Sequence, residues 1–483
     1  MTKLPGTQGL ILEEPLLWEK GDKGRIGFSL PENDVGHFPL DSDLCGETPD
    51  LPDLSELEVI RHYTRLSQWN FGVDSGMYPL GSCTMKYNPK TNERQASLKG
   101  FQAAHPLLPD PLCQGGLRLI HELERLLTEI TGMDAVSLQP AAGAHGELAG
   151  MLIMHAYHRK KGTKPTKIII PDTAHGTNPA SAALCGFKPV TVSSNTEGIL
   201  DTNDVAALMD EDTAGIMITN PNTLGLFEKN LPDIAKIVHD RGGLVYCDGA
   251  NLNALLGVVK LGEIGVDILH LNLHKTFSTP HGGGGPGSGP IAVLKHLEPF
   301  LPIPRVVNNE SYSLQENFPD SIGRLLTFNG HFGILVRAYS YILSLGSELP
   351  RVTEYAVLNA NYLKERLRKI LHLAYDQPCL HECVFSDKEQ HAFGVSSLDM
   401  AKRLIDYGFH PPTVYFPLVV PGAIMIEPTE TESKEDLDLF ITAFEIIARE
   451  AKTNPQLLHE APHNTKVRRL DETTAARKPC LCG

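Results

Sequence analysis

The stretch Asp267-Ile268-Leu269-His270-Leu271-Asn272-Leu273-His274-Lys275-Thr276-Phe277 decides the fold that we predict for this sequence. Apolar and polar residues alternate over 267–273, which is typical of a β-strand. Lys275 is therefore expected at a strand end, where a substrate can approach it. The lysine opens onto the glycine run His281-Gly282-Gly283-Gly284-Gly285-Pro286-Gly287-Ser288-Gly289, which we interpret as a mobile or tightly turning loop at the mouth of a site.

A second predicted strand end carries an aspartate. The apolar run 244–247 delivers Asp248 at its carboxyl end, and a helix-length segment separates it from Lys275. Pyridoxal phosphate needs a lysine amine for its Schiff base and a carboxylate that keeps its ring nitrogen protonated. Each residue alone is more simply explained as a surface lysine or as an aspartate that begins a turn. The two together, in this order, favour this cofactor.

The pattern around these two strands alternates in type along the chain. A helix is predicted over 116–131, ending at Gly132, because apolar residues recur there at helical spacing. Strands are predicted at 135–138, 167–170, 189–192, 214–219, 244–247 and 268–273, with helices at 144–159, 203–209 and 231–240. This order predicts an α/β fold with a mostly parallel sheet covered on both faces. Ligands bind beyond the carboxyl ends of such strands, where Lys275 and Asp248 fall.

The rest of the chain suggests further domains. Residues 1–110 are rich in proline and glycine, with a helical patch at 53–67, and we interpret them as an arm that wraps a core. We predict a large cofactor-binding domain at 111–330, with an irregular segment at 305–327, a smaller α/β domain at 331–452 and an extended tail at 453–483. The small domain is expected to contain helices at 333–345, 352–371, 397–407 and 434–451 and strands at 382–385 and 423–427.

Composition excludes several classes of protein. The chain has 483 residues, 41% apolar and 21% charged, as is ordinary for a soluble enzyme of two or three domains. A net charge of −15 argues against a nucleic-acid partner. We find neither a long apolar run for a membrane span nor a signal or transit peptide at the start, and we expect a cytoplasmic protein.

The spacing of the cysteines indicates no disulfide framework. Nine are scattered through the chain, which we interpret as reduced cytosolic thiols. Cys480 and Cys482 form a lone C-x-C at the end, more simply a free tail than a zinc site. His270 and His274 lie four apart on a predicted strand, which gives no helix face for a metal, so we predict no metal ion.

Three turns after predicted strands offer further site residues. Gly143, Ala144 and His145 open a helix, and backbone N–H groups there can close around a phosphate, although a plain strand-to-helix connection fits equally. His175 follows the next strand, where an imidazole can lie against an aromatic ring or simply cap a helix. Thr223, after the fourth strand, can reach a ring hydroxyl of the cofactor.

Two other motifs need a separate test. Gly282, Gly284 and Gly287 match G-x-G-x-x-G, but a proline interrupts the run and a strand follows rather than a helix, so we reject a nucleotide site. Tyr78-Pro79-Leu80-Gly81-Ser82-Cys83-Thr84-Met85-Lys86-Tyr87-Asn88-Pro89 packs hydroxyls, a thiol and a lysine between turn-forming residues. It is either a structured surface turn or part of a site.

Together these strings resemble a known family. YPLGSCTMKYN at 78–88, AHGTNPAS at 174–181, DGANLN at 248–253, and LNLHKTF with PHGGGGPGSG between 271 and 289 resemble the pyridoxal-phosphate-dependent glycine decarboxylase, the P-protein of the glycine cleavage system. The length resembles subunit 2 of its two-subunit bacterial form. The resemblance implies a type I, aspartate-aminotransferase-like fold and a heterotetramer with two copies each of subunits 1 and 2. It also implies decarboxylation of glycine and transfer of the aminomethyl group to the lipoyl arm of the H-protein.

The resemblance also implies residue roles. Lys275 is the Schiff-base lysine and Asp248 pairs with the ring nitrogen, while Ala250 belongs to the same cofactor site. His175 is expected to stack on the ring. The turn at 143–145 and, less directly, Thr327 are expected to bind the phosphate. His274 beside the lysine is expected to move protons, or to be structural.

Two rival functions remain open. Another type I reaction, such as transamination or cysteine desulfuration, is the nearest, and Cys83 is the one candidate thiol for desulfuration. A non-catalytic scaffold half of a complex is the other, although it has no need of Lys275 and Asp248.

Overall fold

The fold is described from a computed structural model that covers residues 14–21, 24–36, 38–47, 51–282 and 287–480. Its largest sheet has seven strands in the order β1-β7-β6-β5-β4-β2-β3. These are β1 (Ala135–Ser137), β2 (Lys167–Pro171), β3 (Lys188–Val192), β4 (Thr213–Thr219), β5 (Leu244–Gly249), β6 (Ile268–Leu271) and β7 (Ile291–Val293). Neighbours from β3 to β6 run parallel, and β7 is antiparallel to both β6 and β1. The predicted mostly parallel sheet is confirmed.

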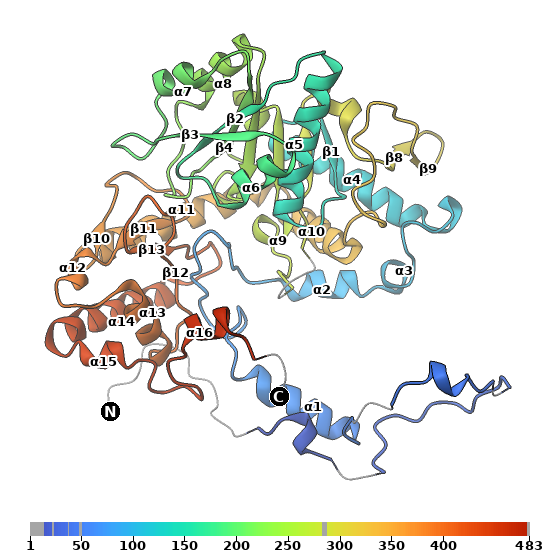
Figure 1. Cartoon of the computed structure of the whole chain (residues 1–483), viewed down its shortest axis with the longest axis vertical. Coiled ribbons are helices and arrows are strands. Elements are labelled where there is room, and N and C mark those ends of the chain that lie inside the picture. The colour runs from blue at the N-terminus through green and yellow to red at the C-terminus, as the bar shows by residue number, and fades with distance from the viewer. Residues whose placement is uncertain (1–13, 22–23, 37, 48–50, 283–286, 481–483) are drawn as a thin grey trace.

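Helices cover both faces of this sheet (Figure 1). They include α4 (Gln114–Thr131), α5 (Gly143–Lys160), α6 (Thr177–Leu184), α7 (Thr202–Leu208) and α8 (Leu231–Asp240). Alternate residues of β5 enter different cores: Val245 and Cys247 pack with α4 and α8, whereas Leu244 and Tyr246 pack with α5. This alternation follows from the two-residue period of a strand and explains why the central strands are apolar throughout.

A smaller antiparallel sheet forms the second α/β unit. It contains β10 (His372–Leu373), β11 (Cys383–Ser386), β12 (Thr413–Val414) and β13 (Ala423–Ile426), in the order β10-β11-β13-β12. Helices in this half of the chain are α10 (Phe332–Leu345), α11 (Leu349–Leu367), α12 (Lys388–His391), α13 (Ser397–Asp406) and α14 (Lys434–Thr453). A separate apolar core fills the space between this sheet and its helices.

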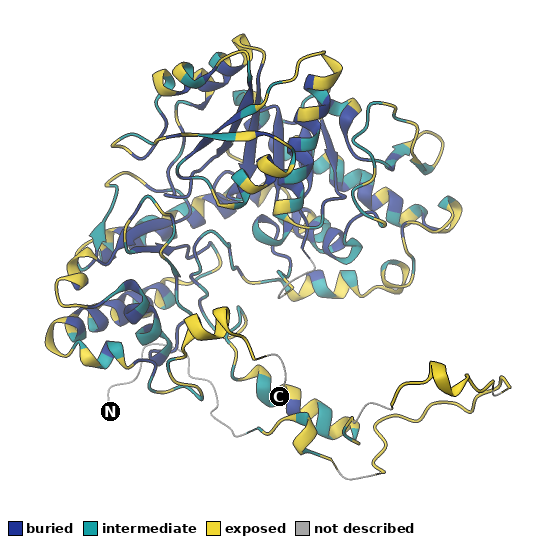
Figure 2. Cartoon of the chain, viewed as in Figure 1, coloured by how far each residue is buried: buried dark blue, intermediate teal, exposed yellow. Residues whose placement is uncertain are grey.

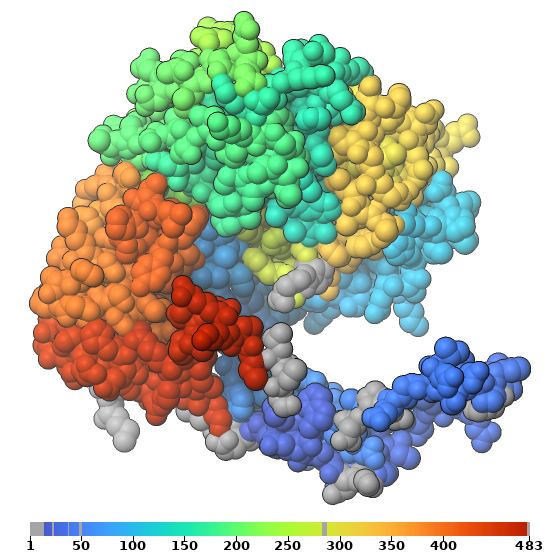
Figure 3. All heavy atoms as spheres, in the orientation of Figure 1, coloured from blue at the N-terminus to red at the C-terminus, as the bar shows by residue number. Residues whose placement is uncertain are grey.

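The N-terminal part adds few residues to the two cores: Met77 belongs to the core of the small sheet, and Ala96 and Phe101 pack against that of the large sheet. Its helices are α1 (Glu56–Ser67), α2 (Lys90–Ala96) and α3 (Lys99–Gln102), and a capping box between Ser55 and Glu58 begins α1. The part before α1 extends away from the body (Figures 1 and 3) and is almost entirely exposed (Figure 2). Between α1 and α2 the chain passes along the small sheet, where Leu80 bridges to Ile426.

Three predicted segments differ from the structure. The strand predicted over 268–273 ends at Leu271, and α9 (Leu273–Thr276) follows it. The segment 305–327 contains a hairpin of β8 (Arg305–Asn308) and β9 (Tyr312–Gln315) instead of being wholly irregular. The tail after 453 contains two short helices, α15 (Gln456–His459) and α16 (Glu472–Arg477), and Cys482 lies outside the described residues. Within the described ranges, no helix combines the length and the apolarity needed to cross a bilayer.

Candidate functional site

Lys275 lies one helical turn beyond the carboxyl end of β6, not directly at the strand end. Asn272 is the residue before α9, and its extended backbone turns the chain from the strand into this single turn. The Lys275 ammonium donates a hydrogen bond of 2.7 Å to the backbone carbonyl of Ser82, which belongs to the segment between α1 and α2. The lysine is therefore held between the large sheet and a distant part of the chain.

Asp248 lies at the carboxyl end of β5, the strand next to β6. Its partner in the parallel register is His270, and Asp248 is only 3% exposed. The carboxylate accepts hydrogen bonds from the Ala250 N–H at 2.9 Å and from the Asn178 side-chain amide at 3.1 Å. The strand register thus brings the predicted carboxylate to the edge of the sheet from which α9 carries Lys275.

A charge network keeps Asp248 ionised. Burial raises the pKa of Asp248, but His270, the Ala250 N–H, the Asn178 amide and Lys275 outweigh it, so the net pKa lies below its ordinary value. His270 Nε2 lies 3.3 Å from the carboxylate, and the Tyr246 hydroxyl lies 2.6 Å from Nδ1. Burial lowers the pKa of His270 below its ordinary value, and the charge of Asp248 partly offsets this. Asp248 is therefore a fixed negative charge in a buried setting.

A second buried carboxyl group, Glu147, lies close to Asp248. Atoms of Glu147, Asp248 and His270 lie within 4.8 Å of one another. The Thr177 and Ser181 hydroxyls donate to Glu147 at 2.8 Å and 3.3 Å, yet burial and the charge of Asp248 raise its pKa to about 7. The sequence prediction missed Glu147; an acidic residue among the small residues of a predicted buried helix was the only signal for it.

The start of α5 forms the wall beside α9. Gly143 packs so closely on Asn272 that a side-chain carbon there would lie 2.7 Å from the amide oxygen. The residue before the helix, Ala142, has no side chain that caps the first N–H groups, and Gly289 lies against the Ala142 carbonyl. The first turn, including the predicted Gly143, Ala144 and His145, thus keeps backbone donors available for an anion.

The remaining predicted site residues have contacts of different kinds. Ala250 contacts Asp248 through its N–H, and the buried Thr223 hydroxyl donates to the Thr173 carbonyl after β2. His175 Nδ1 lies 2.8 Å from the Thr177 hydroxyl, and its ring packs edge-on against Phe416. Thr327 is exposed in the segment between β9 and α10. Three residues later, Gly330 packs against the Leu138 carbonyl, just beyond the end of β1.

His274 points toward the glycine-run segment. Its Nδ1 lies 3.2 Å from the Ser288 N–H, and its ring packs edge-on against His281. Burial, then the charges of His281 and Lys275, lower the pKa of His274 to about 3. Its ring is therefore neutral at physiological pH. The residues at 283–286 lie outside the described part of the chain.

Two buried glutamates that the sequence prediction missed hold the segment over Lys275. Glu382 accepts the Ser82 N–H at 2.8 Å, and Glu427 accepts the Thr84 N–H at 2.8 Å and its hydroxyl at 2.6 Å. Both glutamates are fully buried, and they belong to the small domain. No local sequence signal marks them, because their partners lie more than 290 residues away in the chain.

Several buried polar atoms near Lys275 have no hydrogen-bond partner among the described residues. They include Asn178 Oδ1, Asn272 Oδ1, Thr276 Oγ1 and His281 Nε2. Buried polar atoms in native proteins are nearly always paired. Such atoms at one edge of the sheet, together with a lysine amine, a fixed carboxylate and a free helix start, fit a polar cofactor like pyridoxal phosphate.

Two buried clusters carry metal-ligand atom types. These are Glu147, Asp248 and His270, and, in the small domain, His381, Glu382 and Glu427. The charge of Lys275 acts on every member of both clusters. A second cation at either place is disfavoured by this charge. The absence of a metal from the functional site stays a prediction.

Comparison with known families is consistent with this site. Residues 54–310 match the model of the family described as "Glycine cleavage system P-protein", and residues 352–466 match "Glycine dehydrogenase, C-terminal domain". A protein of Listeria monocytogenes, named "Probable glycine dehydrogenase (decarboxylating) subunit 2", is 58% identical over 97% of this chain and 98% of its own length. A protein of the same name from Caldanaerobacter subterraneus is 56% identical over 96% and 98%.

Solved structures confirm the fold. A glycine decarboxylase (P-protein) of the glycine cleavage system, in inhibitor-bound form, superposes with a TM-score of 0.71 at 20% identity, over 84% of this chain and 93% of that one. The cysteine desulfurase CsdA of Escherichia coli superposes with a TM-score of 0.59 at 15% identity, over 78% and 95%. The predicted type I fold is confirmed by these neighbours.

Proposed function

Since the chain belongs to the glycine cleavage system P-protein family, we propose that it is the pyridoxal-phosphate-binding subunit 2 of a glycine dehydrogenase (decarboxylating). The observation that carries this proposal is the placement of Asp248 and Lys275 beyond adjacent parallel strands. In the proposed reaction glycine loses its carboxylate as CO2, and the aminomethyl group passes to the lipoyl arm of an H-protein. The proposed assembly is a cytoplasmic heterotetramer with two copies each of subunits 1 and 2.

The site residues fit the cofactor in these roles. Lys275 would supply the amine for the Schiff base, and Asp248 would pair with the ring nitrogen. His175 would stack on the ring. Gly143, Ala144 and His145 at the α5 start would hold the phosphate, with Thr327 as a further ligand, while Thr223 and Ala250 would line the ring. When bound, pyridoxal phosphate supplies an electron sink for the bond that breaks at the α-carbon.

The chain's own part in the reaction is to fix charge and exclude water. Asp248 holds a negative charge because Asn178, Ala250 and His270 surround it, and this charge keeps a proton on a ring nitrogen placed beside it. Its low exposure strengthens the interaction, since little water competes. His274 is neutral, and with its Nδ1–H donated to the Ser288 carbonyl at 3.2 Å the Nε2 lone pair is free, so His274 is proposed to receive a proton at Nε2 and return it.

Cysteine desulfuration is disfavoured by the state of Cys83. Burial raises the pKa of the Cys83 thiol to about 11, which leaves almost no thiolate at neutral pH. A desulfurase needs a reactive cysteine near its cofactor, and the thiolate is the nucleophilic form. The likeness to cysteine desulfurases therefore concerns the fold alone.

Co-expression with subunit 1 tests the proposal. The purified complex is expected to be yellow and, with lipoylated H-protein, to exchange labelled bicarbonate into glycine. Lys275→Ala is expected to remove the visible absorbance band and to lower exchange by about three orders of magnitude, equivalent to about 4 kcal/mol. Lys295→Ala, at an exposed lysine paired with Glu298, is the matched control and should keep both properties.

The outcomes separate the rival functions. A colourless wild-type complex indicates a scaffold subunit and contradicts the proposal. A yellow complex that converts glycine to its keto acid, without bicarbonate exchange, indicates a transaminase. Exchange that persists in the absence of H-protein contradicts the proposed acceptor of the aminomethyl group.

A further inference from the structure

The segment Ser82-Cys83-Thr84 places the backbone carbonyl of Ser82 next to the amine of Lys275. The 2.7 Å hydrogen bond from Lys275 Nζ ends on Ser82 O. Ser82 and Thr84 have φ values of 65° and 50°, in the left-handed region that non-glycine residues rarely adopt. Such strain persists only where surrounding contacts enforce it, and it concentrates at functional sites.

The contacts that enforce this shape come from the small domain. Glu382 accepts the Ser82 N–H, and Glu427 accepts both the N–H and the hydroxyl of Thr84. The Gly81 carbonyl accepts a hydrogen bond of 2.8 Å from the Thr413 hydroxyl on β12. These bonds orient the peptides of residues 81–84, but they do not anchor the chain that follows Thr84. A fixed point for that part of the chain must come from another residue.

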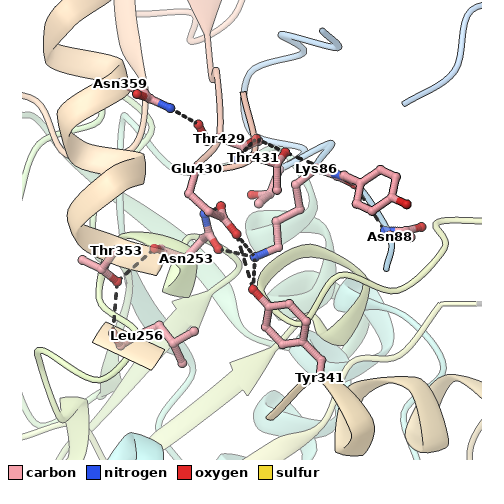
Figure 4. Close-up of polar contacts among 12 residues, drawn as sticks. Lys86, Asn88, Asn253, Leu256, Tyr341, Thr353, Asn359, Thr429, Glu430 and Thr431 are labelled. Atoms are coloured by element: carbon pink, nitrogen blue, oxygen red, sulfur yellow. Dashed lines mark hydrogen bonds and ion pairs between the residues drawn. The ribbon is translucent and has the colours of Figure 1, made fainter. Parts of the chain in front are cut away.

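Lys86 supplies that fixed point (Figure 4). Its ammonium donates to Glu430 at 2.7 Å, to the Asn253 side-chain oxygen at 2.9 Å and to the Tyr341 hydroxyl at 3.2 Å. Asn253 follows β5 in the large domain, Tyr341 is on α10, and Glu430 follows β13 in the small domain. One side chain thus joins the segment to both domains.

The partners of Lys86 are themselves braced (Figure 4). Asn253 donates to Glu430 at 3.1 Å, and its carbonyl accepts from the Thr353 hydroxyl on α11. Asn359, also on α11, donates to the Thr429 carbonyl at 2.9 Å, next to Glu430. The ammonium site is therefore rigid as well as fully paired.

Lys86 stays charged although it is 2% exposed. Burial lowers the pKa of Lys86, but Glu430 and Tyr341 outweigh it, and the net pKa lies above the ordinary value. A buried, paired charge is costly to break, because the remaining partner is left unpaired in the interior. Replacing a buried ion pair by apolar side chains is often neutral or stabilising, so net stability alone does not explain the pairing of Lys86.

We propose that Lys86 is a positioning residue: it fixes the Ser82 carbonyl as the acceptor that holds the Lys275 amine after glycine has displaced that amine from the cofactor. The proposal rests on the proposed function. In the proposed exchange, the C=N bond between the cofactor carbon and the lysine nitrogen breaks, and a C=N bond between the same carbon and the glycine nitrogen forms. Two protons pass from the glycine ammonium to the lysine nitrogen, so the lysine leaves as an ammonium and donates to Ser82 O.

This role predicts a selective defect. The Ser82 carbonyl stabilises the displaced lysine, not the lysine joined to the cofactor. Loosening the segment should therefore leave cofactor binding nearly unchanged and make glycine a weaker competitor for the cofactor carbon. A merely structural role predicts no such separation between the cofactor and glycine.

The test is a glycine titration of the co-expressed complex, followed by the absorbance change of the bound cofactor. For Lys86→Met we expect the half-saturating glycine concentration to rise about tenfold, with the glycine-free spectrum unchanged. Lys90→Met is the matched control, because Lys90 lies four residues away and pairs with Asp74 in a largely exposed ion pair. It should leave the titration unchanged. An unchanged titration in a folded, yellow Lys86→Met complex overturns the proposal.

A double variant covers the case in which the single change prevents folding. Lys86→Met with Glu430→Gln removes both charges, so no buried carboxylate remains unpaired at this point. We expect its thermal midpoint to recover while its half-saturating glycine concentration stays raised. If glycine binding returns to the wild-type value, the ion pair is only structural and the proposal fails.

Hydrogen exchange gives a readout that does not depend on the cofactor. In the cofactor-free complex, the peptide covering 80–88 should exchange faster in Lys86→Met than in Lys90→Met, because the Ser82 and Thr84 N–H bonds loosen. Equal exchange overturns the proposal. A wild-type complex that shows no colour, or no response to glycine, instead overturns the proposed function itself.

Discussion

A buried carboxyl group, Glu228, organises the turn that carries Thr223 after β4. It accepts the Leu200 N–H at 3.0 Å and the Asn222 side-chain amide at 2.8 Å, and its own N–H donates to Asn220 at 3.1 Å. The side chain is 1% exposed and has no cation beside it in these contacts. Burial raises the pKa of Glu228 to about 7. This one residue therefore links a site turn to the pH dependence of stability.

The sign of that dependence follows from proton binding. Between the ordinary pKa of 4.5 and about 7, folded Glu228 keeps a proton that the unfolded chain releases, so stability falls as pH rises. The difference amounts to about 3 kcal/mol. Glu228→Gln mimics the protonated acid, so its thermal midpoint should fall less between pH 5 and pH 8 than that of the wild type. Glu129→Gln, at an exposed glutamate of α4, is the control. Parallel pH profiles for Glu228→Gln and the wild type contradict this assignment.

At the scale of elements, the junction between the α5 start and α9 limits what position 143 tolerates. A side-chain carbon at Gly143 would lie 2.7 Å from Asn272 Oδ1, and Asn272 is buried at the beginning of α9. Gly143→Ala should therefore displace α9 and weaken cofactor binding about tenfold, about 1.4 kcal/mol. Loss of visible absorbance on dialysis measures this. Gly115→Ala, in the first turn of α4 with open space around it, should have no effect. Equal cofactor retention by the two variants refutes the close packing.

The elements of the large sheet were predictable because their patterns are local. The helix ending at Gly132 has φ of 71° at that glycine, as its position predicts, and β2, β4 and β5 begin within one residue of the predicted starts. The end of β6 was not predictable from the sequence, because apolar and polar residues still alternate through Asn272 and Leu273 where the chain already turns into α9. The hairpin at 305–315 pairs two strands of four residues each, and the alternation of Tyr312 and Leu314 with polar residues in β9 is too short to predict a strand.

The candidate site was predictable only where residues follow strands in sequence. Lys275 and Asp248 were found in this way, and the parallel register explains why they share an edge. Glu147, Glu382 and Glu427 were missed, because each contacts the site through segments that the fold, not the sequence, brings together. Contacts of this kind depend on tertiary packing and leave no local periodicity.

At the scale of the whole molecule, the two α/β units meet around the segment that precedes α2, and the N-terminal arm, the described part of residues 14–54, lies apart from both (Figures 1 and 3). The arm exposes large apolar side chains, including Phe28 at 77% and Phe38 at 88%. Its other exposed apolar residues are Leu16, Trp18, Ile26, Leu30, Val35, Leu40, Leu44 and Leu51. So many large exposed apolar side chains on one segment are typical of a surface that a partner covers.

The relatives are named subunit 2, so we expect subunit 1 to cover this arm. Trp18 reports on it directly: the chain has two tryptophans, and Trp69→Phe leaves Trp18, which is 67% exposed, as the only one. Adding subunit 1 should shift the Trp18 emission to shorter wavelength and protect the arm from protease, because burial removes water from the indole.

The arm variants decide between partners. Phe28→Ser with Phe38→Ser should weaken association with subunit 1 at least tenfold, about 1.4 kcal/mol, since two large apolar contacts are lost. Val258→Ser changes an apolar residue that is 59% exposed on the body, and it should leave association unchanged. A blue shift of Trp18 on raising the concentration of this chain alone, without subunit 1, assigns the arm to a second copy of the chain and contradicts the expected partner.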